Sequence, residues 1–300
     1  MVGDSIDYSF LTGEVRRTLP TLPVILDQLT DMLKDIQSPT FAVKEVMSSD
    51  QTMTMKILRV ANSVHYRGER DRVTDVGEAI GTLGYEKINW VVLTSTVFEM
   101  FAGLRGDETF HPADLWKHSL GVAVASRTIA GLSGKCDRDQ AYTCGLLHDI
   151  GKVARLKLDA DEFLQDSKDA LDRQISFYRT ERANGTPLHN YLGQLVCRDW
   201  GLSIETQAAV RWHHAINPKQ RKDLHTKATQ NLIDVVILGN WLTHEMKFGL
   251  SGHQSHGNLP KDLLERLGLD PNGHKELIKE VQGKHKAIRS FVGLLERQAA

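Results

Sequence analysis

Apolar residues recur with a period of about 3.6 along most of the chain, which is the spacing of one face of an α-helix. The pattern is clearest over residues 22–36, where the apolar positions are Ile25, Leu29, Met32, Leu33 and Ile36. No two neighbouring segments alternate apolar and polar residues as paired strands do. The sequence therefore predicts an all-α protein, and its 300 residues allow one large domain or two smaller ones.

The N-terminal third is expected to form a bundle of five short helices, over residues 22–36, 41–47, 50–61, 75–83 and 88–101. Asp50 and Asp75 stand where they can cap the third and fourth helices, and Gly84 stands where it can end the fourth. Residues 91–94 are β-prone, but no second strand candidate lies nearby to pair with them. We therefore predict a helix there as well.

A short polar linker, residues 103–110, is taken as the boundary between two subdomains, residues 1–104 and residues 105–300. Residues 251–258 are interpreted as a flexible loop. The helices expected beyond the linker cover residues 112–130, 137–148, 188–200, 203–214 and 226–248, followed by amphipathic helices within residues 260–297, over 261–267 and 274–295.

Charge balance and cysteine content narrow the class of protein. The 37 basic and 38 acidic residues leave a net charge of -1, which gives no reason to expect binding to nucleic acid or to an anionic membrane. The three cysteines, Cys136, Cys144 and Cys197, have no CxxC spacing and fit a reducing compartment. The first residues are not followed by the apolar core of a signal peptide, and no run of about 18 apolar residues occurs, so we expect a cytoplasmic protein.

The residues that carry chemistry centre on residues 145–152, Gly-Leu-Leu-His-Asp-Ile-Gly-Lys. His148 and Asp149 offer an imidazole nitrogen and a carboxylate to one divalent cation. Lys152 lies one helical turn beyond His148, where its ammonium could contact a phosphate. Adjacent residues of a helix point about 100° apart, but the backbone can relax at a helix end, so that Asp149 could turn toward an ion held by His148.

Further candidate ligands follow the same pattern of an imidazole at a helix end or on an inner face. Asp114 and His118 are four residues apart and lie on one helical face, where they can share a metal or where the carboxylate can orient the imidazole. His189 opens a later helix, and the pair His213 and His214 ends the next one. The alternative interpretation is a vestigial polar core without metal.

Nitrogen and oxygen donors together favour Fe, Mn, Zn or Ni over Ca, which prefers oxygen alone, and over Mg. We expect one or two such ions. The other histidines are interpreted as ordinary core or surface residues, namely His65, His111, His225, His244, His253, His256, His274 and His285.

Three segments of the N-terminal third carry a resemblance to a known family. They are residues 19–23 (Leu-Pro-Thr-Leu-Pro), residues 57–63 (Ile-Leu-Arg-Val-Ala-Asn-Ser), preceded by Ser49 and Asp50, and residues 79–84 (Ala-Ile-Gly-Thr-Leu-Gly). These segments resemble the HDOD family, the HD-related output domain of bacterial signalling proteins. The resemblance covers about residues 15–240 and implies a helical bundle followed by an HD-domain-like helical subdomain.

The histidines and carboxylates beyond the linker occur in the order typical of the HD superfamily of metal-dependent phosphohydrolases, and most closely of its HD-GYP branch. The resemblance implies Asp149 as the bridging ligand and Lys152 as the phosphate contact, the two residues expected to serve catalysis. The metal ligands that it implies are Asp114, His118, His148, Asp149, His189, His213 and His214.

Three positions depart from the HD-GYP pattern. Asn240 stands where a final Asp ligand is expected, so that it is at most a degenerate ligand. Asp114 is shorter than the usual Glu. After His214 the chain lacks the Asp-Gly-x-Gly-Tyr-Pro segment that accompanies cyclic di-GMP hydrolysis, which argues against that substrate.

Two functional hypotheses follow from these resemblances. The first is a regulatory output module of a bacterial signalling pathway, whose HD-like half holds a divalent metal and whose N-terminal bundle meets a protein partner. The second is a metal-dependent phosphohydrolase or phosphodiesterase that acts on a nucleotide or cyclic dinucleotide. The missing Asp and the missing Gly-Tyr-Pro segment favour the first hypothesis, and the ligand set together with Lys152 favours the second.

Overall fold

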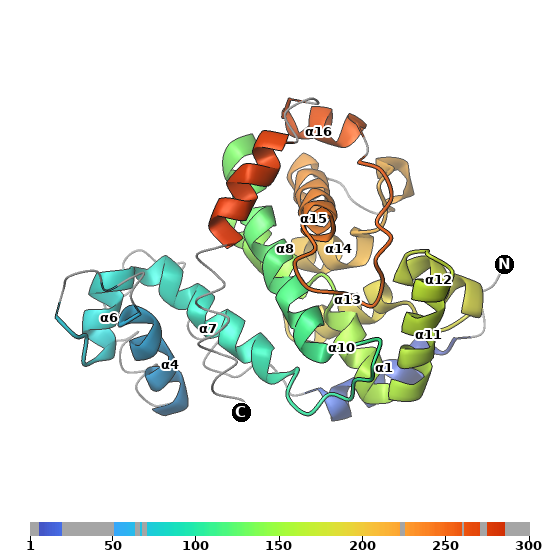
Figure 1. Ribbon diagram of the computed structural model, residues 1–300, viewed down its shortest axis with the longest axis horizontal. Coiled ribbons are helices and arrows are strands. Elements are labelled where there is room, and N and C mark those ends of the chain that lie inside the picture. The colour runs from blue at the N-terminus through green and yellow to red at the C-terminus, as the bar shows by residue number, and fades with distance from the viewer. Residues whose placement is uncertain are drawn as a thin grey trace. The chain divides into compact units, whose positions relative to one another are not determined.

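The computed structural model describes residues 6–19, 51–63, 67, 71–222, 226–259, 261–270 and 275–285, and every regular element in these ranges is a helix (Figure 1). The prediction of an all-α fold is therefore confirmed. The described residues form two compact units. Residues 6–19 and 103–285 belong to the larger unit, and those between 51 and 102 belong to the smaller unit. The predicted division at residues 104 and 105 stays a prediction.

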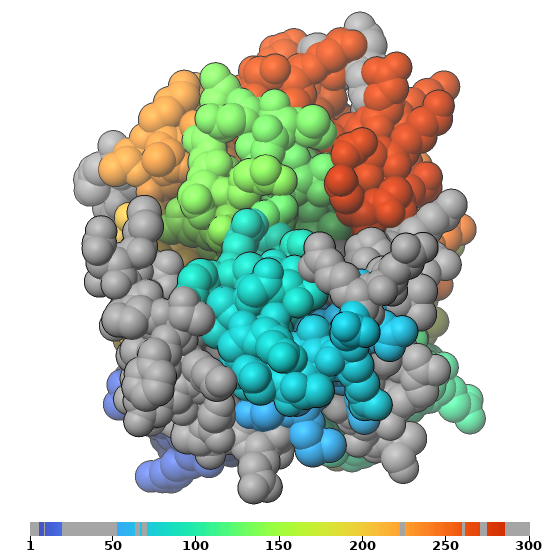
Figure 2. All heavy atoms as spheres, turned by 90° about the vertical axis from the view of Figure 1, so that its left-hand side faces the viewer, coloured from blue at the N-terminus to red at the C-terminus, as the bar shows by residue number. Residues whose placement is uncertain are grey.

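The smaller unit contains α4 (Gln51–Ala61), α6 (Val76–Leu83) and α7 (Tyr85–Glu99), which pack on one another. Figure 2 shows the surface of α6 and α7 in cyan. As predicted, Asp75 caps α6 by accepting a hydrogen bond from the Gly77 backbone at 2.6 Å, and Gly84 separates α6 from α7 with a φ of 80°. The β-prone residues 91–94 lie in the middle of α7, where all are buried, so burial outweighs their strand propensity.

Asn62 fixes the chain where it leaves α4. Its amide nitrogen donates a hydrogen bond to the Val73 carbonyl at 2.7 Å, and its Oδ1 accepts one from the Val73 backbone N–H at 2.8 Å. This reciprocal pair holds the segment before α6 against the end of α4, which gives Asn62 a structural role within the segment 57–63.

The helices of the larger unit are α1 (Tyr8–Thr18), α8 (Pro112–Ser133), α9 (Arg138–Leu147), α10 (Ile150–Leu158), α11 (Ala160–Asp172), α12 (Phe177–Asn184), α13 (His189–Asp199), α14 (Ile204–Trp212), the short 3-10 helix η1 (Pro218–Gln220), α15 (Lys227–Glu245) and α16 (Lys261–Leu267). In this unit α8 packs on α15 (Figure 1), and α9 and α14 pack beside them. Its core is formed by small and branched apolar side chains such as Ala125, Ile129, Val235 and Leu242, all fully buried. A second layer pairs α10 with α13, and α1 packs on both.

Two glycines let the helices that carry His148 and Asp149 approach their neighbours closely. A Cβ placed on Gly145 of α9 would lie 2.7 Å from the Val122 carbonyl of α8. A Cβ placed on Gly151 of α10 would lie 2.6 Å from the Gly193 backbone nitrogen of α13. Both contacts are with backbone atoms, which cannot move aside as a flexible side chain can. The His148 and Asp149 backbone is therefore held between α8 on one side and α13 on the other.

The helices predicted beyond residue 110 are confirmed, with Asp137 capping α9 and Ser203 capping α14. Helices α1 and α10 to α12 were not predicted. The helices predicted over residues 22–36 and 41–47, the cap at Asp50 and the final helix beyond residue 285 lie outside the described residues, whereas residues 275–285 are helical. Within the described part of the chain, no helix has both the length and the apolar character that crossing a membrane requires.

Candidate metal centre

His148 and Asp149 occupy the junction between two helices. α9 ends at Leu147 and α10 begins at Ile150, and Asp149 has a φ of -102° and a ψ of 12°, outside the helical range. This break turns the two side chains toward each other, with His148 Nε2 and Asp149 Oδ2 3.3 Å apart. The expected relaxation of the backbone at a helix end is therefore confirmed. His148 is fully buried and Asp149 is nearly so.

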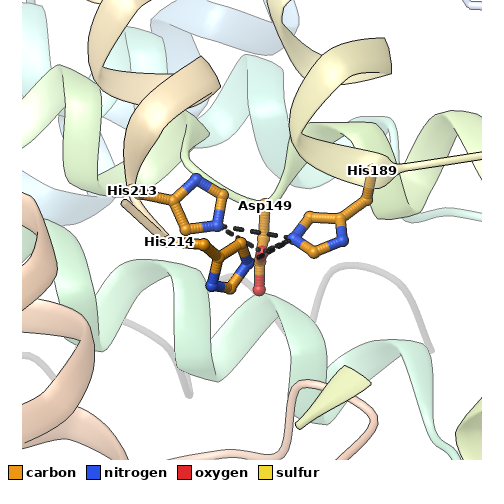
Figure 3. Close-up of side chains that lie close together, drawn as sticks. All are labelled: Asp149, His189, His213 and His214. Atoms are coloured by element: carbon orange, nitrogen blue, oxygen red, sulfur yellow. Dashed lines mark hydrogen bonds and ion pairs between the residues drawn. The ribbon is translucent and has the colours of Figure 1, made fainter. Parts of the chain in front are cut away.

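Three imidazoles gather around the other carboxylate oxygen of Asp149 (Figure 3). His189, the first residue of α13, places its Nε2 3.3 Å from Asp149 Oδ1. His213, immediately after α14, places its Nε2 3.6 Å from the same oxygen, and His214 Nε2 lies 2.9 Å from His189 Nε2. One donor atom from each of these four residues lies within 4.8 Å of all the others.

In His148, His189 and His213, a hydrogen bond from the second ring nitrogen fixes which nitrogen faces the centre. The Nδ1–H of His148 donates to the Gly145 carbonyl, and that of His213 donates to the Val210 carbonyl, both at 2.7 Å. A carbonyl only accepts, so Nδ1 carries the proton in both rings and a neutral ring presents a lone pair at Nε2. In His189 the Nδ1–H donates to the buried carboxylate of Glu181 at 2.7 Å. Such outer hydrogen bonds are typical of metal-binding histidines.

The charges of the site suit a cation at Asp149 Oδ1. Burial alone would raise the pKa of Asp149, but His148 and Lys152 hold it well below its ordinary value, so the carboxylate is ionised. Burial lowers the pKa of His213 to about 4 and that of His214 well below its ordinary value, so both rings are neutral at neutral pH. Burial also opposes charge on His189, but the carboxylate of Glu181 raises its pKa above the ordinary value, so a metal ion at its Nε2 would have to displace a proton.

The opposite carboxylate oxygen, Asp149 Oδ2, already has a cationic neighbour. Lys152 is buried and donates to Asp149 Oδ2 at 2.7 Å and to the Ser251 carbonyl at 2.9 Å. His118 Nε2 lies 4.0 Å from the same oxygen, and at 3.0 Å it donates to Oδ1 of Asn240, which is only an acceptor. His118, His148 and Asp149 thus form a second group of possible metal ligands. In this group, Asp149 Oδ2 already accepts a hydrogen bond from Lys152, and His118 Nε2 already donates one to Asn240.

A buried series of hydrogen bonds and ion pairs connects His189 to Glu181 and Glu181 to Arg155. Glu181 accepts hydrogen bonds from both the backbone N–H and the Nδ1–H of His189, at 2.9 and 2.7 Å. Arg155, also buried, pairs with Glu181 at 3.0 Å and with Asp166 and Glu162 at 2.8 Å each. Because Glu181 touches both the proposed ligand and Arg155, it fixes the orientation of His189 relative to α10.

Asp114 is not brought to this centre. Its carboxylate is 35% exposed and lies 3.7 Å from Lys117 Nζ, one turn along α8. His118, four residues on, is fully buried and turns toward Asn240 and Asp149 instead. A short side chain in the first turn of α8 remains at the helix surface, so the expected sharing of one ion by Asp114 and His118 has no support in the geometry.

Three residues of the site environment were missed by sequence reasoning. Glu181 does not stand at a spacing from the candidate ligands that would mark it as part of the site. His244 and His253 were interpreted as ordinary residues, but their rings form a stack of tilted contacts on His118, with centroids 4.5 Å apart at each step. For His244 a signal existed, because it follows Asn240 by four residues and therefore shares its helical face.

The helical fold and this group of buried histidines around one aspartate define an all-α protein with a side-chain cluster that could bind a metal ion. A comparison with protein families gives the particular family. The profile of the HDOD domain matches residues 19–216, two thirds of the chain, so the protein belongs to the HDOD family. The matched range includes His118, His148, Asp149, His189 and the pair at 213 and 214, and it is shorter than the expected 15–240.

Solved structures share the fold. An HDOD domain protein of unknown function from Geobacter sulfurreducens is 23% identical, with a TM-score of 0.77 over 96% of this chain and 99% of that one. A Shewanella amazonensis protein, provisionally assigned as a phosphohydrolase, is 20% identical, with a TM-score of 0.66 over 97% and 98%. A Marinobacter aquaeolei protein, provisionally assigned to signal transduction, is 15% identical, with a TM-score of 0.75 over 97% and 66%.

An uncharacterised protein of Treponema pallidum is 21% identical over 265 residues, which are 85% of this chain. The chain spans only 47% of the length of that relative. The matching part is therefore about half of a longer protein in that organism.

Proposed function

We propose that this protein is a regulatory output module of a bacterial signalling pathway, in which the cluster at Asp149 binds one divalent transition metal ion for structure or sensing. The proposed ligands of that ion are Asp149 Oδ1 and the Nε2 atoms of His189, His213 and His214. The protein would act in the cytoplasm and pass its state to a protein partner. Family membership supports the signalling role, and the geometry of the cluster supports the metal.

The spacing of the donor atoms is the observation that carries the metal proposal. The three distances among Asp149 Oδ1, His189 Nε2 and His213 Nε2 are 3.3, 3.4 and 3.6 Å. Two ligands at the usual distance of about 2.0–2.1 Å from a tetrahedral zinc ion are separated by about 3.3 Å. Direct hydrogen bonds are usually shorter than these three distances. The fourth proposed ligand is closer, because His214 Nε2 lies 2.9 Å from His189 Nε2, which is the length of a hydrogen bond. The spacing of the first three ligands therefore fits a shared cation.

Three imidazole nitrogens and one carboxylate oxygen are donors suited to Zn, Fe, Mn or Ni. A second ion would have to use His118, His148 and Asp149 Oδ2. Lys152 already donates to that oxygen, and the Nε2–H of His118 is directed to Asn240. We therefore propose one tightly held ion and treat a second as dependent on displacement of the Lys152 ammonium.

Elemental analysis of the purified full chain tests the proposal. We expect about one transition metal ion per chain, and loss of that ion in Asp149→Ala, because the variant removes the one anionic ligand on which the three imidazoles converge. Asp159→Ala is a matched control, since Asp159 caps α11 without contacting the cluster, and it should keep the metal. A wild-type chain that takes up no metal after incubation with Zn²⁺, Mn²⁺, Fe²⁺ or Ni²⁺ would contradict the proposal.

The regulatory role is preferred to hydrolysis because residues that phosphoryl chemistry would use are engaged or absent. Lys152 is 1% exposed, and its ammonium already donates to Asp149 and Ser251, so it is poorly placed to meet a phosphate. Asn240 supplies a neutral oxygen where an anionic ligand would help to hold a second ion, and Asp114 lies apart. Two-metal hydrolysis relies on both ions to activate the attacking oxygen and stabilise the leaving one.

The second candidate function is metal-dependent hydrolysis of a phosphate ester of a nucleotide or cyclic dinucleotide. It is favoured by the intact donor group at Asp149 Oδ1 and by the provisional assignment of the Shewanella relative. A panel of cyclic di-GMP, cyclic mononucleotides, nucleoside phosphates and a generic phosphodiester, tested with Mn²⁺ and Fe²⁺, should show turnover that Asp149→Ala abolishes. Asn240→Asp should raise that turnover. No turnover in either the wild type or Asn240→Asp would exclude this function.

A further inference from the structure

Arg211 is a partly buried cation without an acidic partner among the described residues. In the larger unit, each of the other partly or fully buried arginines that the structure describes pairs with a carboxylate. The pairs are Arg127 with Asp139, Arg155 with three acids, and Arg221 and Arg266 with Asp234. Taking a guanidinium out of water is costly unless an anion meets it. Arg211 therefore departs from the pattern of its own unit.

Aromatic rings hold the Arg211 guanidinium in place. Its central carbon lies 4.8 Å from the Tyr191 ring centroid and 4.7 Å from that of Trp212. Such cation–π contacts position a guanidinium without using its N–H donors. The backbone is fixed as well, because the Asn190 amide donates to the Arg211 carbonyl at 2.6 Å. The result is a positioned guanidinium, for which no hydrogen bond to an acceptor is seen within the described ranges.

Arg211 belongs to the helix whose end carries two residues of the candidate metal centre. Arg211 precedes His214 by three residues at the end of α14, so the two lie on the same face of that segment (Figure 3 shows His214). His214 is only partly buried, and the Tyr178 ring stacks on it with centroids 4.5 Å apart and planes at 13°. The exposed Arg182 lies over the Tyr178 ring at 6.0 Å. The Tyr178 ring thus covers the partly exposed His214, and Arg182 lies over the same ring.

We propose that Arg211 binds the phosphate group of a ligand beside the metal ion, with Arg182 as a second, outer cationic contact. The inference deepens the proposed function and rests on the metal ion there. A guanidinium presents parallel N–H donors that match two phosphate oxygens, which a point charge such as Lys does not. Since Lys152 is engaged inside the cluster, Arg211 takes the role of phosphate contact that sequence reasoning gave to Lys152.

The ligand chemistry is a phosphate, either free or as a phosphate ester. Calorimetric titration of the full, metal-loaded chain with inorganic phosphate and with adenosine and guanosine monophosphates tests it and separates the two sources. Arg211→Met, which keeps an unbranched side chain for the rings to contact, should weaken binding roughly ten- to hundred-fold, as expected for loss of a charged hydrogen-bonding partner. Tighter binding of the monophosphates than of phosphate would identify an ester as the ligand.

Two further variants make the test specific. Arg211→Lys keeps the charge and should recover part of the affinity, and Arg179→Met, which alters an exposed arginine of α12, should leave it unchanged. Metal content is measured for each variant and should stay at the wild-type value. Equal affinity of Arg211→Met and wild type, or no binding by the wild type at roughly millimolar ligand, would overturn the proposal.

Failure of the metal proposal gives a different result. If the wild-type chain holds no metal, the same titrations are made with the metal-free chain. Binding that Arg211→Met still weakens would support the phosphate site by itself, and absence of such binding would overturn it.

Discussion

Gly151→Ala is expected to lower the free energy of unfolding by about 3 kcal/mol or more and to remove the bound metal. The added Cβ would meet the His189 carbonyl and, at 2.6 Å, the Gly193 backbone nitrogen, so α10 and α13 would have to separate. That separation would move His189 away from Asp149 Oδ1. Urea denaturation measures the loss of stability, and elemental analysis measures the loss of metal.

The matched control is Gly13→Ala in α1 of the same unit. No heavy atom outside its own helix lies within 4 Å of a Cβ placed there, among the described residues. Alanine favours a helix over glycine by about 1 kcal/mol, so this variant should be as stable as the wild type or more stable. If the stability of Gly151→Ala were equal to or above that of the wild type, as expected for Gly13→Ala, the result would contradict the close approach of α10 to α13.

Arg155→Met is expected to cost about 3–5 kcal/mol of stability, which is the usual penalty for removing one partner of a buried ion pair. The substitution leaves Glu181 and Asp166 buried and without their common cation, so that Glu181 keeps only its hydrogen bonds from His189. Arg155 also lies over the Phe163 and Phe177 rings, at 5.7 and 5.6 Å, so an apolar side chain can still occupy the space. Thermal and urea denaturation measure the change.

Arg173→Met is the control for charge removal at a surface pair. Arg173 pairs with Asp169 at 3.0 Å, but its side chain is 48% exposed, and such pairs contribute up to about 1 kcal/mol. Arg155→Lys separates charge from geometry, since it keeps a cation that cannot pair with three carboxylates at once, and should fall between the wild type and Arg155→Met. A loss in Arg155→Met no larger than in Arg173→Met would mean that the buried network contributes little.

The helices could be predicted because their signals are local. The cap at Asp75, the turn at Gly84 and the caps at Asp137 and Ser203 depend on neighbouring residues alone. α1 and α10 to α12 were not anticipated. α12, for example, has a polar sequence with only two apolar aromatic positions, and it buries Phe177 and Glu181 because of partners on other helices. Such tertiary burial has no local signature.

The site was anticipated only in part. His148, Asp149, His189, His213 and His214 could be grouped because their order resembles the ligand order of the HD superfamily, and the structure brings donor atoms of Asp149, His189, His213 and His214 together. The state of each residue could not be foreseen. Lys152 donates a hydrogen bond to the carbonyl of Ser251, almost one hundred residues away, and Asp114 lies at the surface. Whether a charged side chain is available to a ligand depends on contacts between distant segments, which spacing along the chain does not encode.

The position of the donors at helix junctions links occupancy to assembly of the fold. Asp149 lies between α9 and α10, His189 at the start of α13, and His213 and His214 at the end of α14. A cation shared by these groups would act as a cross-link that exists only when the three junctions are docked, and mass action would then stabilise the docked form in proportion to the logarithm of free metal. Around Asp149, binding of the cation and packing of α13 and α14 would therefore be coupled, so that a change in either one would shift the other.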